Sequence, residues 1–376
     1  MGAMFTDPHR RTEVITAWAA ASGIGLAIGP VLAGVLLQVA DWHAVYVSTI
    51  VLGLITLGVT AQWVSESRSP GVRVDVPGLV LATLTVAATV FAQIEGGRNG
   101  YGSPVVLSAW IVGAVALVLF VVVELRVPQP MLDVRLFRSA SFSAVMLVAA
   151  VSLFGFTGVS IVLVLLLQQA KGLSPLDAGV RMLALLGAYV VVAAAVGPLI
   201  RRTGFKAPLA AGLGLGGVAA LALAGQGPAT PFAEQWPLFV LFGVGVGLVA
   251  APATAAALAS VAPAQAGMAS GAVNAARQLG SVLGPSVLGT LLTTTMLAQL
   301  PNRLAERGLD GQAAAEAQAA VVAGHTAAIT QSARAAVGDA LGAGVQAGLL
   351  LTGIVYLIAA LAALTLVRNR PHRITS

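Results

Sequence analysis

Four polar side chains within long apolar runs are the residues of this chain best placed to carry chemistry: Gln168, Gln169, Asn274 and Arg277. Polar and ionisable groups are costly in such runs, so they favour a functional role such as ligand binding or proton transfer. Trp18 lies in a further apolar run, where its ring could face an organic cation. We expect these five residues to line a cavity for a small amphipathic molecule.

Each of the five also has a purely structural interpretation. The long side chain of Arg277 could extend to the membrane surface, and Asn274 could hydrogen-bond a neighbouring helix. Gln168 and Gln169 could cap the end of their helix, and Trp18 could pack against lipid or another helix. The sequence leaves both interpretations open.

Other charged residues near apolar runs have simpler expected roles. Asp177 and Arg181 are four residues apart, a spacing that brings side chains together on a helix, so we expect an ion pair on the outer surface. Glu13 and Glu124 lie at the edges of apolar runs. We favour edge positions without a role in proton coupling for both.

Enzymatic chemistry is not expected. The sequence has no cysteine and no G-x-x-x-x-G-K-[ST], H-E-x-x-H or G-x-S-x-G pattern. The G-x-G-x-x-G match from Gly212 to Gly217 lies in an apolar run with no preceding strand, which argues against dinucleotide binding. We therefore expect no enzyme activity, no cofactor, no metal site and no nucleic-acid partner.

The composition is that of a membrane protein. Hydrophobic residues make up 58% of the chain and charged residues only 9%, whereas about 25% of the residues in soluble proteins are charged. Arg and Lys fall mostly in short loops, where they determine orientation by the positive-inside rule. With the N-terminus in the cytoplasm, fourteen of the 20 basic residues lie on the cytoplasmic side. We expect a multi-pass protein of a bacterial inner (plasma) membrane with both termini cytoplasmic.

Runs of about 20 apolar residues cross a bilayer as a helix, and the sequence contains ten such runs. They lie at about residues 14–39, 44–64, 77–94, 105–123, 142–168, 178–200, 207–224, 238–258, 269–297 and 345–367. Residues 301–342 are Ala-rich but carry scattered charges, so we expect one or two solvated helices there. The sequence therefore predicts an all-α integral membrane protein with about ten transmembrane helices.

Two of these runs share the pattern G-x-x-x-G-P-x-x-x-G, the second copy lying 255 positions after the first (280 − 25). Small residues four apart let another helix approach closely in a membrane. We expect packing contacts at Gly25, Gly29, Pro30, Gly34, Gly280, Gly284, Pro285 and Gly289. The repeat favours two homologous halves over two unrelated glycine-rich helices.

These motifs together resemble the major facilitator superfamily, specifically its fourteen-helix drug:proton antiporter branch. The first glycine-proline stretch resembles the antiporter signature of that family's fifth helix, and residues 267–284 resemble its eleventh helix. Residues 95–104 are similar to the turn between its two inserted helices, residues 130–137 to the start of its second half, and residues 168–179 to an outer loop.

The resemblance implies a bundle of two pseudo-symmetric halves. Residues 1–65 would be the last two helices of the N-terminal half, residues 66–138 two inserted linker helices, and residues 139–376 the six-helix C-terminal half. The family's first four helices, with the residues usually credited with proton coupling, would precede Met1. Residues 197–206 correspond to a cytoplasmic gating loop, in which the resemblance gives roles to Arg201, Arg202, Gly204 and Lys206.

The resemblance further implies a secondary transporter that exports amphipathic drugs by alternating access, in exchange for protons. Its expected partners are the lipid bilayer, a small amphipathic substrate and protons. One alternative is a non-transporting or split-subunit fragment that needs a complementing chain for the missing helices. Another is a metabolite or lipid exporter of the same fold.

Overall fold

The protein is all-helical throughout the part that the computed structural model describes, which is residue 25 and residues 28–63, 75–262, 265–309, 311–322 and 330–369. Within these described ranges, nine helices are long and apolar enough to cross a membrane. They are α2 (Trp42–Trp63), α3 (Val76–Asn99), α4 (Pro104–Arg126), α5 (Ala140–Leu165), α6 (Pro175–Ala195), α8 (Lys206–Ala224), α9 (Phe232–Ala259), α10 (Ala266–Ala305) and α12 (Gln331–Leu366). No strand occurs in these ranges, so the predicted all-α class is confirmed.

Shorter segments connect the long helices. They are the helix Ile28–Val39, the 3-10 helix η1 (Val134–Arg138), the π-helical turn η2 (Leu166–Ala170) that ends α5, α7 (Gly197–Thr203) and α11 (Gly311–Val322). The first predicted span, residues 14–39, lies largely outside the described residues, and its described part is the helix Ile28–Val39. Each of the other nine predicted spans overlaps one long helix, although the sixth, residues 178–200, continues past the end of α6 at Ala195 into α7.

Local sequence explains where several helices begin. Ser103, Ser139 and Ser174 each accept a backbone N–H of the first turn of the helix that follows, at 3.3, 3.4 and 3.1 Å. Such side chains satisfy amide groups that have no partner within the helix. Proline follows Ser103 and Ser174 directly, at a position where its missing N–H costs nothing.

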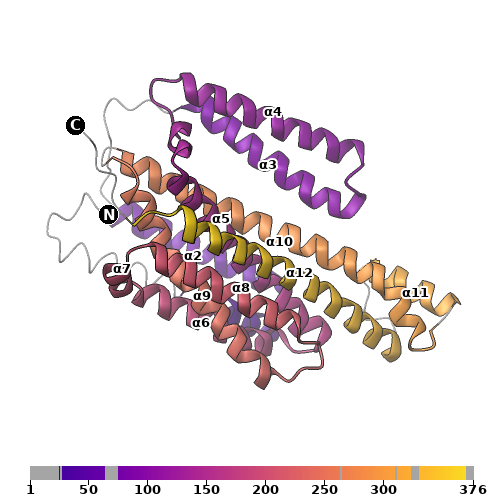
Figure 1. The fold of residues 1–376 in the computed structure, drawn as a ribbon. Helices are drawn as coiled ribbons and strands as arrows, with labels where there is room; N and C mark the ends of the chain where they lie inside the picture. The colour runs from indigo at the N-terminus through magenta and orange to yellow at the C-terminus, as the bar shows by residue number, and fades with distance from the viewer. Residues whose placement is uncertain are drawn as a thin grey trace.

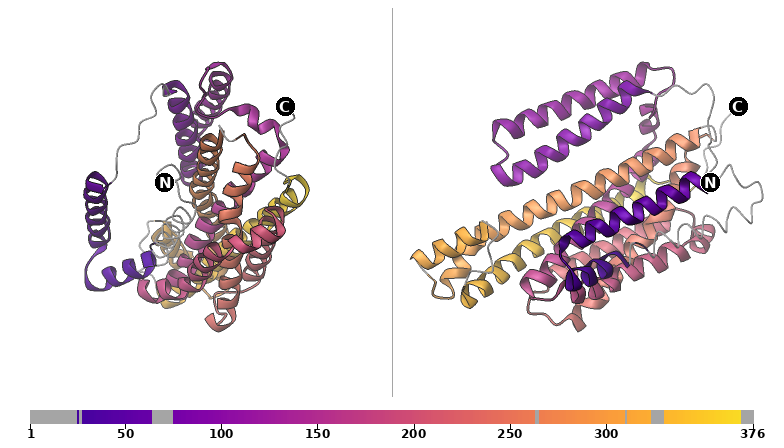
Figure 2. Two further views of the ribbon diagram at one scale, coloured as in Figure 1. Left: turned by 90° about the vertical axis from the view of Figure 1, so that its left-hand side faces the viewer. Right: turned by 180° about the vertical axis from the view of Figure 1, so that it is seen from behind.

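The long helices from α5 onward form one bundle (Figure 1). Helix α5 packs against α10 and α12, α12 packs against α8, and α9 lies between α6 and α8. The α3–α4 hairpin forms a separate layer that rests on α10 through α3. Helix α2 has no buried residue and stands apart from the bundle in Figure 2.

The centre of the bundle holds one fully buried tyrosine. Tyr356 of α12 is 0% exposed, and its hydroxyl donates to the backbone oxygen of Ser152 on α5 at 2.7 Å. Its ring stacks on Phe242 of α9 with centroids 5.6 Å apart. A Cβ atom on Gly155 would lie 2.3 Å from the ring, so the ring fills space that only glycine leaves open. Tyr356 therefore ties together three helices in the interior.

One prediction about helix ends was wrong. Residues 301–342 were expected to lie outside the spanning helices, but α10 continues to Ala305 and α12 already begins at Gln331. At 1.5 Å per residue, helices of 40 and 36 residues are ~60 and ~54 Å long. The hydrocarbon layer is only about 30 Å thick. Both helices therefore extend well beyond the membrane.

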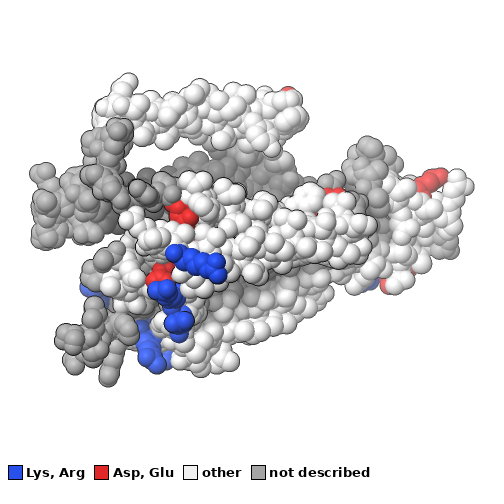
Figure 3. Space-filling view, turned by 90° about the horizontal axis from the view of Figure 1, so that it is seen from above, with Lys and Arg blue, Asp and Glu red and all other residues white. Residues whose placement is uncertain are grey.

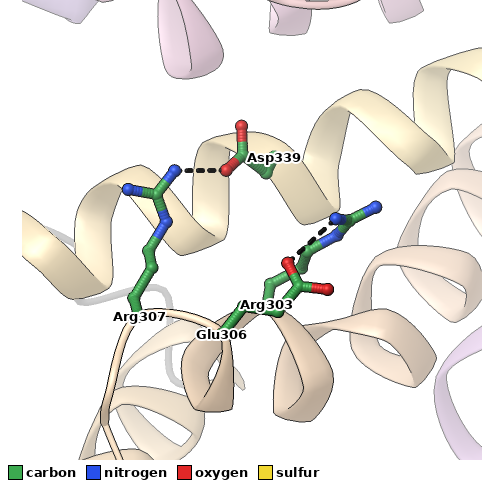
Figure 4. Close-up of polar contacts among 4 residues, drawn as sticks. All are labelled: Arg303, Glu306, Arg307 and Asp339. Carbon is green, nitrogen blue, oxygen red and sulfur yellow. Dashed lines mark hydrogen bonds and ion pairs between the residues drawn. The ribbon is translucent and has the colours of Figure 1, made fainter.

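Apolar contacts explain why these extensions stay helical. Beyond the membrane, α10, α11 and α12 enclose a small core of Leu300, Leu304, Ala317, Ala333, Ala336 and Ala340. Figure 4 shows Arg307, in the turn after α10, paired with Asp339 of α12, and Arg303 bonded to Glu306 at 3.0 Å. The sequence signal of scattered charge predicted solvent exposure correctly for these side chains but missed the core between them.

Candidate functional site

The closest helix contact in the described bundle that involves the glycine-proline repeat lies between α5 and α10. A Cβ atom on Gly280 would lie 1.9 Å from the carbonyl oxygen of Ala150, and one on Gly284 would lie 2.1 Å from that of Phe154. The two backbones therefore run in parallel and almost touch. Thr157 of α5 adds a hydrogen bond to the backbone oxygen of Ser281 at 3.0 Å. Helices in lipid associate through such small residues and polar bridges.

The first copy of the repeat makes a different contact. A Cβ atom on Gly34 would lie 2.7 Å from Cα of Leu176 at the start of α6, and one on Gly179 would lie 2.8 Å from the carbonyl oxygen of Pro30. The helix Ile28–Val39 is thus held against α6. Among the described atoms, nothing lies within 4 Å of a Cβ placed on Gly25, Gly29 or Gly289. Pro285 lies half-buried inside α10.

We expect Gly34→Ala to weaken the contact between the helix Ile28–Val39 and α6, because the added methyl group would meet the Leu176 backbone. Overpacking of this kind costs about 1–3 kcal/mol. Gly29→Ala is the matched control, since it adds the same methyl group where no described atom lies within 4 Å. Disulfide cross-linking between cysteines placed on the two helices should become less efficient in Gly34→Ala alone. Equal cross-linking in both variants would contradict the prediction.

Arg277 lies where four helices meet. Its Nη2 atom donates to the backbone oxygen of Ala250 on α9 at 2.8 Å, so the side chain reaches across the bundle instead of along its own helix. It interacts electrostatically with Tyr189 of α6. The Tyr189 ring in turn packs on Phe156 of α5, with centroids 4.9 Å apart. The guanidinium thus interacts with a phenol that itself packs on an aromatic ring, and Asn274 is exposed one turn earlier on α10.

The two glutamines lie far from this group. Because α5 and α10 run in parallel, with Gly280 beside Ala150, Gln168 is about 20 residues above the level of Arg277. That separation is ~30 Å at 1.5 Å per residue. Gln168 is half-buried and Gln169 exposed in the π-helical turn η2. Trp18 lies outside the described residues. The structure brings together Asn274 and Arg277 of the five predicted cavity residues and does not bring the glutamines to them.

The predicted gating loop is fastened to the end of α12. The side chain of Asn369 accepts the N–H of Lys206 at 2.9 Å and donates to the backbone oxygen of Thr203 at 3.3 Å. Gly204 has φ +74, a left-handed conformation that ends α7, and its missing Cβ leaves room for Asn369. Arg201 and Arg202 are exposed. The loop is therefore hydrogen-bonded to the residues that follow α12.

At the opposite end of the bundle, the half-buried side chain of Lys171 makes two hydrogen bonds. Lys171 donates to the backbone oxygen of Thr230 and to Oε1 of Gln235 at 2.8 Å, and Gln235 is only 1% exposed. Burial, and then the neighbouring positive charge of Arg181, lower the pKa of Lys171.

The prediction of an ion pair between Asp177 and Arg181 was wrong. Ser174 bonds Asp177 at 2.6 Å, and Arg181 lies over the Phe232 ring, 5.1 Å from its centroid.

The lowered pKa of Lys171 predicts how the stability of the folded protein changes with pH. The unfolded chain binds more protons than the folded one between the folded pKa and the ordinary value of 10.5, so stability should rise with pH through that alkaline window. Lys171→Met should abolish this rise and cost about 1–3 kcal/mol, because Gln235 loses its donor. Thermal unfolding of the intact protein at several alkaline pH values measures both effects. Lys206→Met is the control; the same rise in both variants would contradict the assignment to Lys171.

An apolar groove of about 660 Å³ lies between the hairpin and the bundle. It is lined by Ala82, Thr83, Val86, Ala87, Val90, Phe91 and Ile94 of α3 and by Val282 of α10. Val282 is exposed, on the side of α10 away from the close contact with α5. The groove therefore lies on a different side of α10 from the contact with α5 and faces the hairpin.

Comparison with known proteins decides the family. Residues 1–285 match the family described as the Major Facilitator Superfamily. This chain belongs to the major facilitator superfamily. This chain is 31% identical over 311 residues to the multidrug resistance protein Stp of Mycobacterium tuberculosis. The alignment covers 81% of this chain and 57% of Stp.

Two further relatives of this major facilitator protein come from Streptomyces. It is 29% identical to the methylenomycin A resistance protein of Streptomyces coelicolor, covering 77% of this chain and 61% of that protein. It is 30% identical to the tetracenomycin C resistance and export protein of Streptomyces glaucescens, covering 80% and 56%. The chain thus spans about three-fifths of the length of the curated relatives it matches.

One solved structure resembles the fold. It is a bacterial homolog of the human lysosomal transporter Spinster in an inward-facing and occupied conformation, with a TM-score of 0.48 and 20% sequence identity. The likeness covers 93% of this chain and 83% of that one. The chain is a multi-pass membrane protein, because it matches the superfamily and its described part contains nine long apolar helices.

Sequence reasoning missed several residues of this major facilitator protein that the fold brings into contact. Tyr189 and Tyr356 lie in apolar runs, as Arg277 does, and only 4 tyrosines occur in the chain. The rule that singled out Arg277 would have found both tyrosines. Asn369 and Gln235 gave no such signal, because each lies at a helix end where polar residues are ordinary.

Proposed function

We propose that this chain is a secondary transporter, and not an enzyme, that exports amphipathic drugs or similar small molecules by alternating access coupled to protons. The observation that carries the proposal is membership of the major facilitator superfamily with relatives named as multidrug or antibiotic resistance proteins. Alternating access in such folds arises from rocking of two halves about a central site. Protons are the proposed coupling ions, and the lipid bilayer is the surrounding partner.

The group around Arg277 supports an amphipathic substrate. Arg277 offers guanidinium donors, and Tyr189, with which it interacts, offers an aromatic face that packs on Phe156. A molecule with an apolar body and one polar group can satisfy both kinds of partner. Asn274 adds an amide on the exposed side of α10. The proposed substrate site therefore includes Asn274 and Arg277, with Gln168 and Gln169 assigned to the outer end.

The proposed orientation places both termini in the cytoplasm of a bacterium, with the protein in its inner membrane. At one end of the bundle, hydrogen bonds join the residues after α12 to Ser141 at the start of α5 and to Lys206. The described basic residues on the segments that adjoin these contacts are Arg126, Arg135, Arg138, Arg201, Arg202, Lys206 and Arg368. On the face seen in Figure 3, most of the Lys and Arg side chains gather toward that end. The positive-inside rule supports a cytoplasmic location for it. We further propose that residues 1–65 are the last two helices of the N-terminal half, residues 66–138 two inserted linker helices, and residues 139–376 the C-terminal half.

A second candidate is a transporter completed by a separately encoded chain. Helix α2 has no buried residue, although it is apolar along its whole length. On α10, a Cβ atom on Gly267 or Gly271 would meet no described atom within 4 Å. Small residues on such faces permit close approach by further helices. A complementing chain would supply those helices.

A lipid or metabolite exporter of the same fold is the third candidate. The groove of about 660 Å³ between α3 and Val282 favours a lipid, because its walls are almost wholly apolar. An acyl chain fits such walls better than a charged metabolite does. A drug exporter should protect cells against toxic compounds, whereas a lipid or metabolite exporter should release its own substrate without such protection.

Expression in a bacterium deprived of its own drug exporters tests these candidates. We expect the full chain to raise the inhibitory concentrations of amphipathic antibiotics severalfold, and everted membrane vesicles to release protons when such a drug is added. Arg277→Ala should lose both effects, whereas Thr293→Ala, at an exposed position further along the same helix, should keep them. Protection only with a co-expressed partner would favour the second candidate. Lipid release without drug protection would favour the third.

A further inference from the structure

Two buried carboxylates meet at the base of the α3–α4 hairpin. Asp75 caps the start of α3, where its Oδ1 atom accepts the N–H of Gly78 at 2.9 Å, and it is 9% exposed. Glu124 lies in the last turn of α4 and is 2% exposed. Its Oε2 atom accepts the N–H of Leu132 at 3.1 Å. Each carboxylate therefore uses one oxygen to hold the local backbone.

The second oxygens of the two carboxylates lie close to one point. Oδ2 of Asp75 and Oε1 of Glu124 are buried and have no hydrogen-bond partner among the described residues. A Cβ atom on Gly78 would lie 2.5 Å from the first and 2.8 Å from the second, so both oxygens lie against one point. A buried oxygen without a donor costs about 1–3 kcal/mol. Glycine at position 78 leaves open the space against which both oxygens lie.

The charges around this pair are acidic. Glu124 interacts electrostatically with Asp75 and with Asp133, which lies at the start of η1. The basic residues on the adjoining described segments, Arg126 on α4 and Arg135 and Arg138 on η1, are exposed. None of them forms an ion pair with Asp75 or Glu124 in the described chain. Two adjacent buried carboxylates cannot both ionise without strong repulsion.

We propose that Asp75 and Glu124 form a proton-binding site in which the two carboxyl groups hold one proton between them. The proton is placed on Oε1 of Glu124 and donated to Oδ2 of Asp75, which gives both orphaned oxygens a partner. Hydrogen bonds between a carboxylic acid and a carboxylate are short and strong. The ligand of this site is a proton, and the site does not depend on the identity of any transported molecule.

The pair also connects the hairpin to the bundle. Leu132, which Glu124 holds, is followed by Asp133, whose N–H donates to Sδ of Met268 on α10 at 3.1 Å. Figure 1 shows the base of the hairpin at the end of the molecule where η1 leads into α5. Loss of the shared proton would place two negative charges in one buried space. The hairpin base would then separate from α10.

Infrared difference spectroscopy of the intact protein in lipid nanodiscs, titrated from about pH 5 to about pH 9, tests the site. We expect a protonated carboxyl band at neutral pH that shifts in heavy water and disappears at high pH. Glu124→Gln should remove it, because the amide can donate to Asp75 without a proton being bound. Glu234→Gln, at an exposed position on α9, should leave the band unchanged.

Two results would overturn the proposal. One is a wild-type spectrum without a protonated carboxyl band at neutral pH, which requires no variant. The other is a band that persists unchanged in Glu124→Gln. If Glu124→Gln does not fold, Asp75→Asn serves instead, and its band should disappear at a different pH from that of the wild type. An identical titration of Asp75→Asn and the wild type would remove Asp75 from the site.

Discussion

Replacing Gly280 or Gly284 by alanine is expected to disrupt the bundle more than any other single methyl addition to the glycine-proline repeat. Each new Cβ atom would lie about 2 Å from a backbone oxygen of α5, at 1.9 Å from Ala150 and 2.1 Å from Phe154. A backbone oxygen cannot rotate away as a side chain can. The two helices would have to separate along their whole contact.

Two opposing effects decide the size of this change. Alanine favours a helix over glycine by about 1 kcal/mol, and this gain applies at every helical glycine. Overpacking typically costs about 1–3 kcal/mol, and loss of the close contact adds to it because Thr157 then loses its hydrogen bond to Ser281. The packing cost exceeds the gain at Gly280 and Gly284. Both variants should therefore unfold at lower temperature and lose transport.

Gly289→Ala is the matched control on the same helix. It belongs to the same repeat, but no described atom lies within 4 Å of its added Cβ. Only the helix-propensity gain remains, so its thermal unfolding should match or exceed that of the wild type. Thermal unfolding of the three detergent-solubilised variants measures the difference. Equal midpoints for Gly280→Ala and Gly289→Ala would refute the assigned contact.

Replacing Arg277 is expected to have the second large effect, on transport more than on folding. Arg277→Ala removes the donor to the backbone oxygen of Ala250 and the positive charge beside Tyr189. A hydrogen bond from a charged donor is worth about 1.5–3 kcal/mol. In the proposed substrate site the Arg277 guanidinium is such a donor to the substrate. Its removal should therefore lower the initial rate of export by at least ~10-fold, since each 1.4 kcal/mol is a factor of ten.

Arg277→Lys separates charge from shape. Lysine keeps the positive charge but carries a compact ammonium in place of the planar guanidinium, so it cannot reproduce the same reach and stacking. We expect export between that of the wild type and Arg277→Ala. Drug accumulation in intact cells at matched membrane expression measures it. Wild-type export by Arg277→Ala would show that this side chain serves packing alone.

The sequence by itself determined that the chain spans a membrane, and nearly where. Each apolar run partitions into lipid on its own composition, because a helix satisfies its backbone internally. The nine long helices therefore coincide with predicted spans. The largest errors in helix ends lie in residues 301–342, where α11 is a solvated helix as expected but contacts among α10, α11 and α12 extend the two long helices. Those contacts join segments that a hydropathy window never compares.

The sequence also singled out Arg277 and the second glycine-proline stretch, since a charge in an apolar run and a repeated spacing are visible in one dimension. It could not distinguish Gly280 and Gly284, which touch α5, from Gly289, which does not. Nor could it pair Asp75 with Glu124, because α3 and α4 bring their ends together only by folding back on each other. Which face of each helix meets which neighbour depends on packing between distant segments, and the tertiary structure alone decides it.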